Sequence, residues 1–128
     1  MGIFMIDFQN GIIVKLKITQ NGEYEDTISP ILIDGESILF SYKTVRDGVV
    51  FTNRRIITLN FKEITRTSVD ISSLPYSKIQ AFSVETTGAG LNDAKLELWF
   101  SGLGKVKLEF FRGTDVRKLC NLISKNVL

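Results

Sequence analysis

The segment KLELWFSGLGKVKLEFF, residues 95–111, decides the fold class of this 128-residue chain. Apolar and polar residues alternate on both sides of a centre that contains two glycines, which is the pattern of two half-buried strands joined by a tight loop. Pairing Phe100 with Val106 turns both apolar faces inward and leaves residues 102–104 as the loop. The inward residues are then Leu96, Leu98, Phe100, Val106, Leu108 and Phe110. The segment therefore predicts an antiparallel β-hairpin with one buried face.

The outward face of this hairpin carries large aromatic residues. In the same register Trp99 lies opposite Lys107, which predicts a cation–π contact, and Glu97 lies opposite Glu109, which predicts a like-charge pair. Aromatic side chains on the solvent side of strands are enriched at protein interfaces. We therefore nominate an interface made of Trp99, Phe111, Lys107 and Glu97. The alternative is that the N-terminal residues or the final helix cover the two aromatic rings.

Outside the hairpin, the chain continues the β pattern on one side and ends in a helix on the other. Five further β-branched or alternating runs precede the hairpin, over residues 38–44, 49–52, 55–61, 68–74 and 79–87. Behind the hairpin, Thr114 or Asp115 is placed to cap a helix over 114–127, in which apolar residues recur at spacings of three and four. Seven strands and one helix predict an all-β barrel or sandwich whose open end is plugged by the C-terminal helix.

The N-terminal residues differ from the rest of the chain in charge. Residues 1–37 hold two lysines and six acidic residues, a net charge of −4, so residues 38–128 carry +6 of the overall +2. We therefore divide the chain into an acidic N-terminal arm, 1–37, and a barrel with its helix, 38–128. Within the arm, residues 12–18 favour a strand, and Asn21-Gly22 favours a turn. The opposite charges suit docking of the arm on its own barrel or on a neighbouring subunit, and the sequence does not separate the two.

Composition excludes several classes of function. The chain has no histidine and one cysteine, so it cannot build a histidine general base, a histidine-bearing metal site or a disulfide within the chain. We expect no catalytic residues, metal or cofactor, and the spacing around Cys120 predicts a small core residue. A net charge of +2 predicts no nucleic-acid partner and no attraction to a membrane surface. Without a signal-peptide pattern or a run long enough to span a bilayer, the expected location is the cytoplasm.

Five short motifs follow one another in the chain: Lys43–Asp47, Val50–Ile57, Leu74–Ile79, Phe82–Gly88 and Leu96–Phe100. Taken together and in order, they resemble the bacterial pleckstrin-homology (PH) domain family over residues 30–127. The resemblance implies a PH-like barrel of seven strands in two orthogonal antiparallel sheets, capped by a C-terminal α-helix. It also implies an absence of enzymatic activity and assembly into ring-like homo-oligomers.

One departure from the wider PH pattern concerns ligand binding. In eukaryotic phosphoinositide-binding relatives, the resemblance implies basic residues on a long loop between the first two strands. Here Lys43 and Arg46 are followed at once by the turn residues Asp47-Gly48. This turn leaves no room for a loop that wraps a headgroup, which argues against lipid binding.

A cluster of polar residues has two interpretations. Its members are Arg46, Asp47, Arg54, Arg55 and Glu85. They are either an anion contact, to which Lys43 would contribute, or a structural ion cluster in which the arginines pair with Asp47 or Glu85. Adjacent arginines on a strand point to opposite faces, so Arg54 and Arg55 cannot both line one flat site, and this favours the structural interpretation.

The sequence thus predicts a non-enzymatic protein–protein interaction module that self-assembles into a homo-oligomer through exposed strand edges and the Trp99 face. A further, unidentified protein partner is compatible with the same surfaces. The alternative is an anion- or lipid-headgroup-binding module that uses Lys43, Arg46, Arg54 and Arg55.

Overall fold

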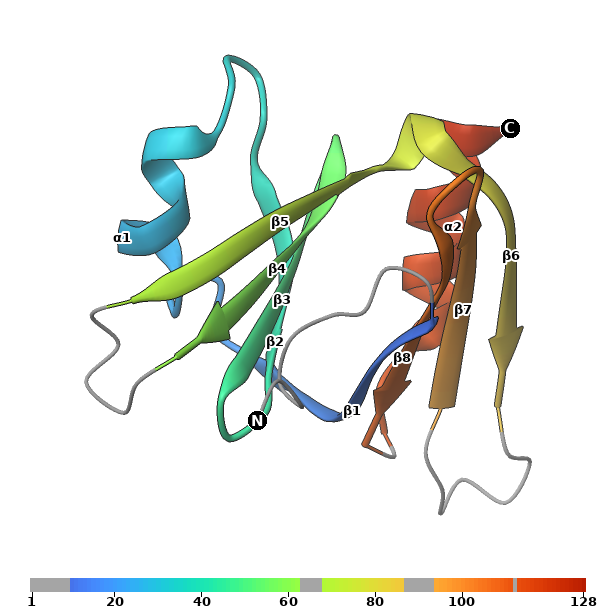
Figure 1. The fold of residues 1–128 in the computed structure, drawn as a ribbon, viewed down its shortest axis with the longest axis horizontal. Coiled ribbons are helices and arrows are strands. Elements are labelled where there is room, and N and C mark those ends of the chain that lie inside the picture. Colours follow the sequence, from blue (N-terminus) through green and yellow to red (C-terminus); the bar gives the residue numbers. More distant parts are fainter. Residues whose placement is uncertain (1–9, 63–67, 87–93, 112) are drawn as a thin grey trace.

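The structure is a computed structural model that describes residues 10–62, 68–86, 94–111 and 113–128. Within these residues, eight strands and two α-helices follow one another (Figure 1). The strands are β1 (Asn10–Thr19), β2 (Ile38–Lys43), β3 (Asp47–Thr52), β4 (Arg55–Phe61), β5 (Val69–Pro75), β6 (Ile79–Glu85), β7 (Ala94–Phe100) and β8 (Gly104–Phe110). The helices are α1 (Glu25–Ile28) and α2 (Val116–Val127), with short 3₁₀ turns η2 (Ser29–Ile31) and η3 (Tyr76–Lys78).

The eight strands form one continuous sheet in the order β5-β4-β3-β2-β1-β8-β7-β6. Figure 1 shows β2 to β5 on one side and β6 to β8 with α2 on the other, with β1 passing between them. The predicted β fold with a C-terminal helix is confirmed, and Asp115 is the helix cap. The prediction of seven strands in two orthogonal antiparallel sheets is corrected: β1 is an eighth strand that joins the two halves into one sheet, and it pairs in parallel with β8. That strand comes from the residues expected to form the N-terminal arm.

A bulge in β1 lets one strand serve both halves of the sheet. β1 pairs in parallel with β8 and antiparallel with β2, and its register against β8 shifts between Ile13 and Leu16. Within that shift Lys15 has a φ of 61°, in the left-handed region that only glycine adopts without cost. The extra residue bends β1, so that its first half belongs to one side of the fold and its second half to the other.

We expect Lys15→Gly to raise the free energy of unfolding by about 1 kcal/mol, because it relieves a left-handed conformation that costs a side-chain-bearing residue this order of energy. Urea denaturation measures the change. The control is Lys17→Gly two residues along the same strand, where no positive φ occurs and glycine should destabilise. A destabilised Lys15→Gly variant would show that the bulge tolerates lysine without strain.

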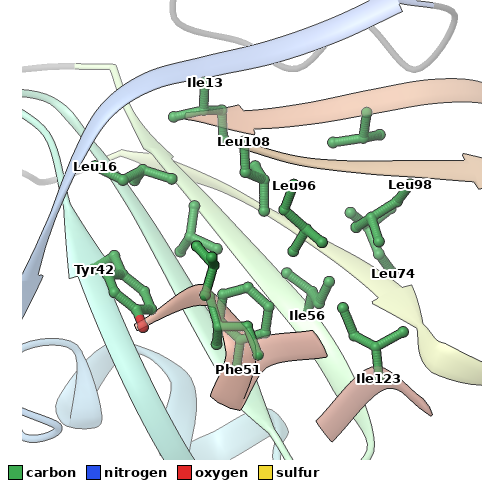
Figure 2. Close-up of a cluster of buried hydrophobic side chains, with 14 of the residues drawn as sticks. Ile13, Leu16, Tyr42, Phe51, Ile56, Leu74, Leu96, Leu98, Leu108 and Ile123 are labelled. Carbon is green, nitrogen blue, oxygen red and sulfur yellow. The ribbon is translucent and has the colours of Figure 1, made fainter. Parts of the chain in front are cut away.

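The main core lies between the two halves of the sheet and under α2 (Figure 2). Figure 2 shows Ile13 and Leu16 of β1, Tyr42 of β2 and Leu96 of β7 directed into this space. From α2 the buried residues are Val116, Leu119, Leu122 and Ile123, the stripe expected from the spacing. The helix therefore closes the open end of the fold with its apolar face and leaves its polar face outside.

A second, smaller core covers the outer face of the β2–β5 half. Tyr24 and Ile28, from the long connection between β1 and β2, pack there against Val50, Ile57 and Phe61. Every residue of β3 is consequently buried, since one face meets the main core and the other meets this connection. Residues 24–32 thus dock within the same chain, on the outside of the sheet.

The β7–β8 hairpin forms, but its predicted register was wrong by two residues. Phe100 pairs with Gly104 and not with Val106, so the loop is residues 101–103. The observed loop has three residues, as predicted, but lies one position earlier, and glycines suit its backbone because Gly102 and Gly104 have φ values of 82° and 103°. A shift of two residues keeps every side chain on its own face, and the predicted inward set is therefore correct.

Candidate functional site

The connection between the first two strands is long and acidic. Because β1 is the first strand, this connection is residues 20–37 and not the short turn after Lys43. It contains no lysine or arginine. Its five carboxylates are Glu23, Glu25, Asp26, Asp34 and Glu36. The expected short connection was therefore wrong, because the loop between the first two strands has eighteen residues. Its negative charge gives a different reason why an anionic headgroup is disfavoured there.

Glu36 anchors this connection to the sheet through hydrogen bonds and an ion pair. Its side chain is 0 % exposed, and both carboxylate oxygens accept hydrogen bonds from Arg55, at 2.9 Å each. The Thr52 hydroxyl donates a further hydrogen bond of 2.7 Å. Burial alone would raise the pKa of Glu36, but the hydrogen bonds from Arg55, Thr52 and the Ile33 N–H, with the charge of Arg55, hold this pKa below 4.5. The carboxylate is thus kept ionised inside the protein.

Arg55 is committed to internal contacts. Besides Glu36, its guanidinium donates to the Ile31 carbonyl at 2.7 Å and to the Ser73 hydroxyl at 2.9 Å. It therefore ties the connection to β4 and β5. We expected Asp47 or Glu85 as the partner of the arginine pair, but the partner of Arg55 is Glu36, nineteen positions earlier in the chain.

Arg46 and Asp47 also form hydrogen bonds within the protein that stabilise the fold. The Arg46 guanidinium donates to the carbonyl oxygens of Phe61 and Lys62, at 3.2 and 2.9 Å. The Asp47 carboxylate is buried and accepts a 2.7 Å hydrogen bond from Asn60. Burial raises the pKa of Asp47, while the Asn60 hydrogen bond and the charge of Arg46 oppose this shift.

The remaining members of the predicted polar cluster do not converge. Lys43 forms a half-exposed ion pair with Glu23 at 3.6 Å. Arg54 is exposed, and its guanidinium lies near Gly35 of the connection, where a Cβ would be 4.0 Å from one of its nitrogens. Glu85 lies at the end of β6, the strand at the far edge of the sheet from β5, and pairs in register with Lys95. No common anion site is therefore formed by Lys43, Arg46, Arg54 and Arg55.

The predicted interface residues share a face but do not form one patch. Trp99 is 36 % exposed, and Lys105 lies over its ring at 5.9 Å. Glu97 forms a 3.5 Å ion pair with Lys107, which replaces the like-charge pair expected from the other register. Phe111 is 43 % exposed but lies six residues beyond Lys105, about 20 Å along the strand direction. The two aromatic rings are therefore separate exposed sites at opposite ends of the hairpin.

Other cavities and clusters offer little chemistry. An open cavity of about 360 Å³ lies beside α1 and is lined by Asn21, Glu25, Ser29, Leu32, Glu36 and Ile38, among others. Within the described ranges, no group of three or more acidic or cysteine residues is arranged to hold a metal ion. No helix among these residues has the length and apolar character needed to cross a bilayer. Cys120 is half-buried on α2.

Sequence reasoning missed Glu36 and Tyr24, which organise the connection. Glu36 was counted only as part of the charge of the arm. The sequence pattern around Glu36 was weak, because it consists of a single Asp34-Gly35-Glu36 turn, and its partner Arg55 lies nineteen positions later in the chain. Tyr24 had a clearer signal, an aromatic residue with Ile28 at a spacing of four, next to the acidic residues of a first helical turn.

Several known proteins are similar to this chain in sequence or in fold. Two curated relatives from Bacillus subtilis are similar: uncharacterized protein YjqA, 34 % identical over 74 % of this chain and 76 % of its own length, and uncharacterized protein YozO, 31 % identical over 78 % and 86 %. Among solved structures, a DUF1696-family protein with a pleckstrin-homology domain from Shewanella loihica has a TM-score of 0.75 and 33 % identity, covering 91 % of this chain and 100 % of that one. A pleckstrin-homology domain from Shewanella amazonensis has a TM-score of 0.64 and 39 % identity, covering 86 % and 90 %.

A third structure shares the fold at lower identity: a PH-domain-containing protein from Exiguobacterium sibiricum has a TM-score of 0.66 at 19 % identity. It covers 87 % of this chain and 61 % of that one. The profile of the family described as "Bacterial PH domain" matches residues 7–127, which includes all of β1 and the whole acidic connection. This chain belongs to the bacterial PH domain family.

Proposed function

We propose that this protein is a non-enzymatic interaction module that associates with further copies of itself through the open end of its sheet at β6. The proposal rests on the observation that one side of the edge strand β6 is unpaired among the described residues. β6 is the last strand of the sheet and pairs on one side only, with β7, among the described residues. An unpaired edge is a ready template for a strand from another chain.

The two edges of the sheet differ in how well they are protected. β5 contains Asp70 and ends in Pro75, and both residues discourage pairing. β6 contains no lysine or proline, and the small residues Ala81 and Ser83 lie exposed on its outer face. Trp99 stands next to Ala81 in register and is part of the same surface. The β6 edge is thus the better site for association.

An anion- or lipid-headgroup-binding role has less support. Arg46 and Arg55 donate to internal acceptors, and Lys43 is paired with Glu23. The first connection, where the resemblance to eukaryotic PH domains would place basic residues, is acidic. A phosphate at this end of the molecule would meet carboxylates, and the geometry therefore favours protein contact.

Light scattering of the full chain at micromolar concentration tests the proposal. We expect a mass above that of the monomer, and we expect Ala81→Lys with Ser83→Lys to shift the mass towards the monomer, because lysines blunt a free edge. The matched control, Leu103→Lys, adds positive charge at the exposed hairpin loop and should leave the mass unchanged. The proposal is contradicted if the wild-type protein is monomeric across this concentration range, or if the two β6 substitutions leave its mass unchanged.

A further inference from the structure

The tripeptide Gln-Asn-Gly occurs twice in this chain, at residues 9–11 and at residues 20–22. The fold places the two copies differently. Residues 10 and 11 begin β1 and pair in parallel with β8. Residues 21 and 22 are exposed in the turn that follows β1. The same local sequence thus lies in a paired strand in one place and in an open turn in the other, so a difference in reactivity between the two comes from the fold.

The turn leaves the backbone nitrogen of Gly22 accessible. The hydrogen bond that closes the turn is donated by the Glu23 N–H to the Gln20 carbonyl, at 3.0 Å. Among the described residues, the Gly22 N–H itself donates to no acceptor. A Cβ at Gly22 would lie 3.8 Å from Oε1 of Glu25, its nearest neighbour outside the adjacent residues. The nitrogen is therefore not engaged in the fold, and the space around this residue is open.

The side chain of Asn21 makes a contact that depends on its amide group. Its Nδ2 donates a hydrogen bond of 3.2 Å to the Leu39 carbonyl, which ties the start of the connection to β2. An asparagine side chain both donates and accepts hydrogen bonds, whereas a carboxylate only accepts them. Loss of the NH2 group would therefore remove this tie and leave two acceptor oxygens facing each other.

We propose that Asn21 is a site of spontaneous deamidation, a covalent modification that consumes only water. The Gly22 nitrogen gives up its proton and bonds to Cγ of Asn21, the side-chain amide leaves as ammonia, and a five-membered succinimide ring closes. Water then opens the ring at either carbonyl and produces aspartate or isoaspartate. Glycine suits the first step because it has no Cβ to hinder the approach of its nitrogen. Asn21 and Gly22 also line the open cavity beside α1, so water reaches both.

The fold protects the first copy of the tripeptide. Ring closure requires a rotation of the asparagine backbone that brings the next nitrogen towards Cγ, and reaction rates depend steeply on such an approach. Residues 10 and 11 are restrained by their pairing with β8, whereas the turn at residues 21 and 22 has no strand partner. Asn10 should therefore keep its amide group under conditions in which Asn21 loses it.

The modification should loosen the start of the connection as the protein ages. The product loses the hydrogen bond to Leu39. It also adds a negative charge close to the exposed carboxylates of Glu25 and Asp26, and like charges on one surface repel. This inference concerns the connection alone and does not depend on the proposed self-association.

Peptide mapping by mass spectrometry tests the proposal, because trypsin cleaves after Lys15 and Lys17 and so separates Asn10 from Asn21. The folded full chain is incubated in mildly alkaline buffer, and the mass gain from amide to acid is followed in each peptide. We expect Asn21 to be converted about tenfold faster than Asn10, because only the turn allows the reactive approach. Equal rates, or faster conversion of Asn10, would overturn the proposal.

Two controls separate the effect of the fold from that of the sequence. In urea, both copies of the tripeptide should lose their amides at similar rates, because β1 no longer restrains one of them. Gly22→Ala should slow the conversion of Asn21 several-fold and leave Asn10 unaffected, and it should fold, since the added methyl group has only the 3.8 Å contact with Glu25. The proposal fails if the difference between Asn10 and Asn21 persists in urea, or if Gly22→Ala does not slow the reaction.

The effect on the connection is measured with Asn21→Asp, which has the same side chain as one product. This variant should have a lower melting temperature than the wild type, because the donor to Leu39 is lost. The matched control is Gln20→Glu, the same change of amide to carboxylate on an exposed side chain that, within the described ranges, forms no hydrogen bond. Its melting temperature should stay close to that of the wild type. If the two variants melt alike, the Leu39 contact does not link the modification to the connection, and that part of the inference is wrong.

Discussion

Replacing Gly48 with alanine is expected to lower the free energy of unfolding by about 2–3 kcal/mol, because overpacking a filled core costs this much. A Cβ at this position would lie 2.5 Å from Cζ of Tyr24 and 2.7 Å from its Cε2. The Tyr24 ring cannot simply withdraw. It stacks on Phe61 at 5.9 Å between centroids, and its hydroxyl donates to the Asp47 carbonyl at 3.4 Å. The added methyl group therefore separates the connection from the sheet.

A double-mutant cycle with Tyr24→Ala isolates this contact. Tyr24→Ala alone should cost about 3–5 kcal/mol, as loss of a buried aromatic ring does. In that background Gly48→Ala should cost far less, because the atoms that it would meet are gone. The control is Gly22→Ala, where the nearest atom is 3.8 Å away, and it should change stability by no more than about 0.5 kcal/mol. Additive costs in the urea-unfolding cycle would show that the Tyr24 contact is not the cause.

Local patterns were enough to predict the strands that follow residue 37 and the final helix. Alternation fixed which side chains of β7 and β8 face inward, and a stripe at spacings of three and four fixed the buried face of α2. The register of the hairpin was not fixed by alternation, because pairings that differ by two residues bury the same side chains. The preference between them lies in the glycine loop and in the opposite charges of Glu97 and Lys107.

The place of β1 and of the acidic connection could not be predicted in the same way. The pairing of β1 with β8 joins residues 94 or 95 positions apart, and the local sequence of β1 does not indicate which strand it pairs with. The same holds for Glu36, whose partner Arg55 is recognisable only once the connection has folded over the β2–β5 half. The strand pairing of β1 and the ion pair of Glu36 with Arg55 determine which charged side chains are buried and which are exposed, and so they determine the candidate site.

Replacing Arg55 with alanine is expected to destabilise the protein by about 3–5 kcal/mol, because it leaves a buried carboxylate without its cation. Glu36 is the group left behind, and its side chain is 0 % exposed. The double variant Glu36→Leu with Arg55→Met removes both charges and should cost clearly less than Arg55→Ala alone. The neighbouring Arg54→Ala removes an exposed cation and should change stability by about 0.5 kcal/mol or less. Equal losses for Arg54→Ala and Arg55→Ala in urea unfolding would mean that the buried pair is not what stabilises the connection.

The same pair predicts how stability depends on pH. The pKa of Glu36 in the folded protein lies below its usual value of 4.5, so the folded state favours the ionised carboxylate. Its contribution is therefore complete above about pH 4.5 and is lost as the pH falls through the folded pKa. The raised pKa of buried Asp47 acts in the opposite direction, since protonation of that group favours the folded state. We thus expect the melting temperature of the wild type to exceed that of Glu36→Gln at neutral pH, and the difference to shrink as the pH is lowered below 4.5. A difference that is constant across this range would show that Glu36 stabilises the connection by shape alone, and that its charge pairing with Arg55 contributes nothing.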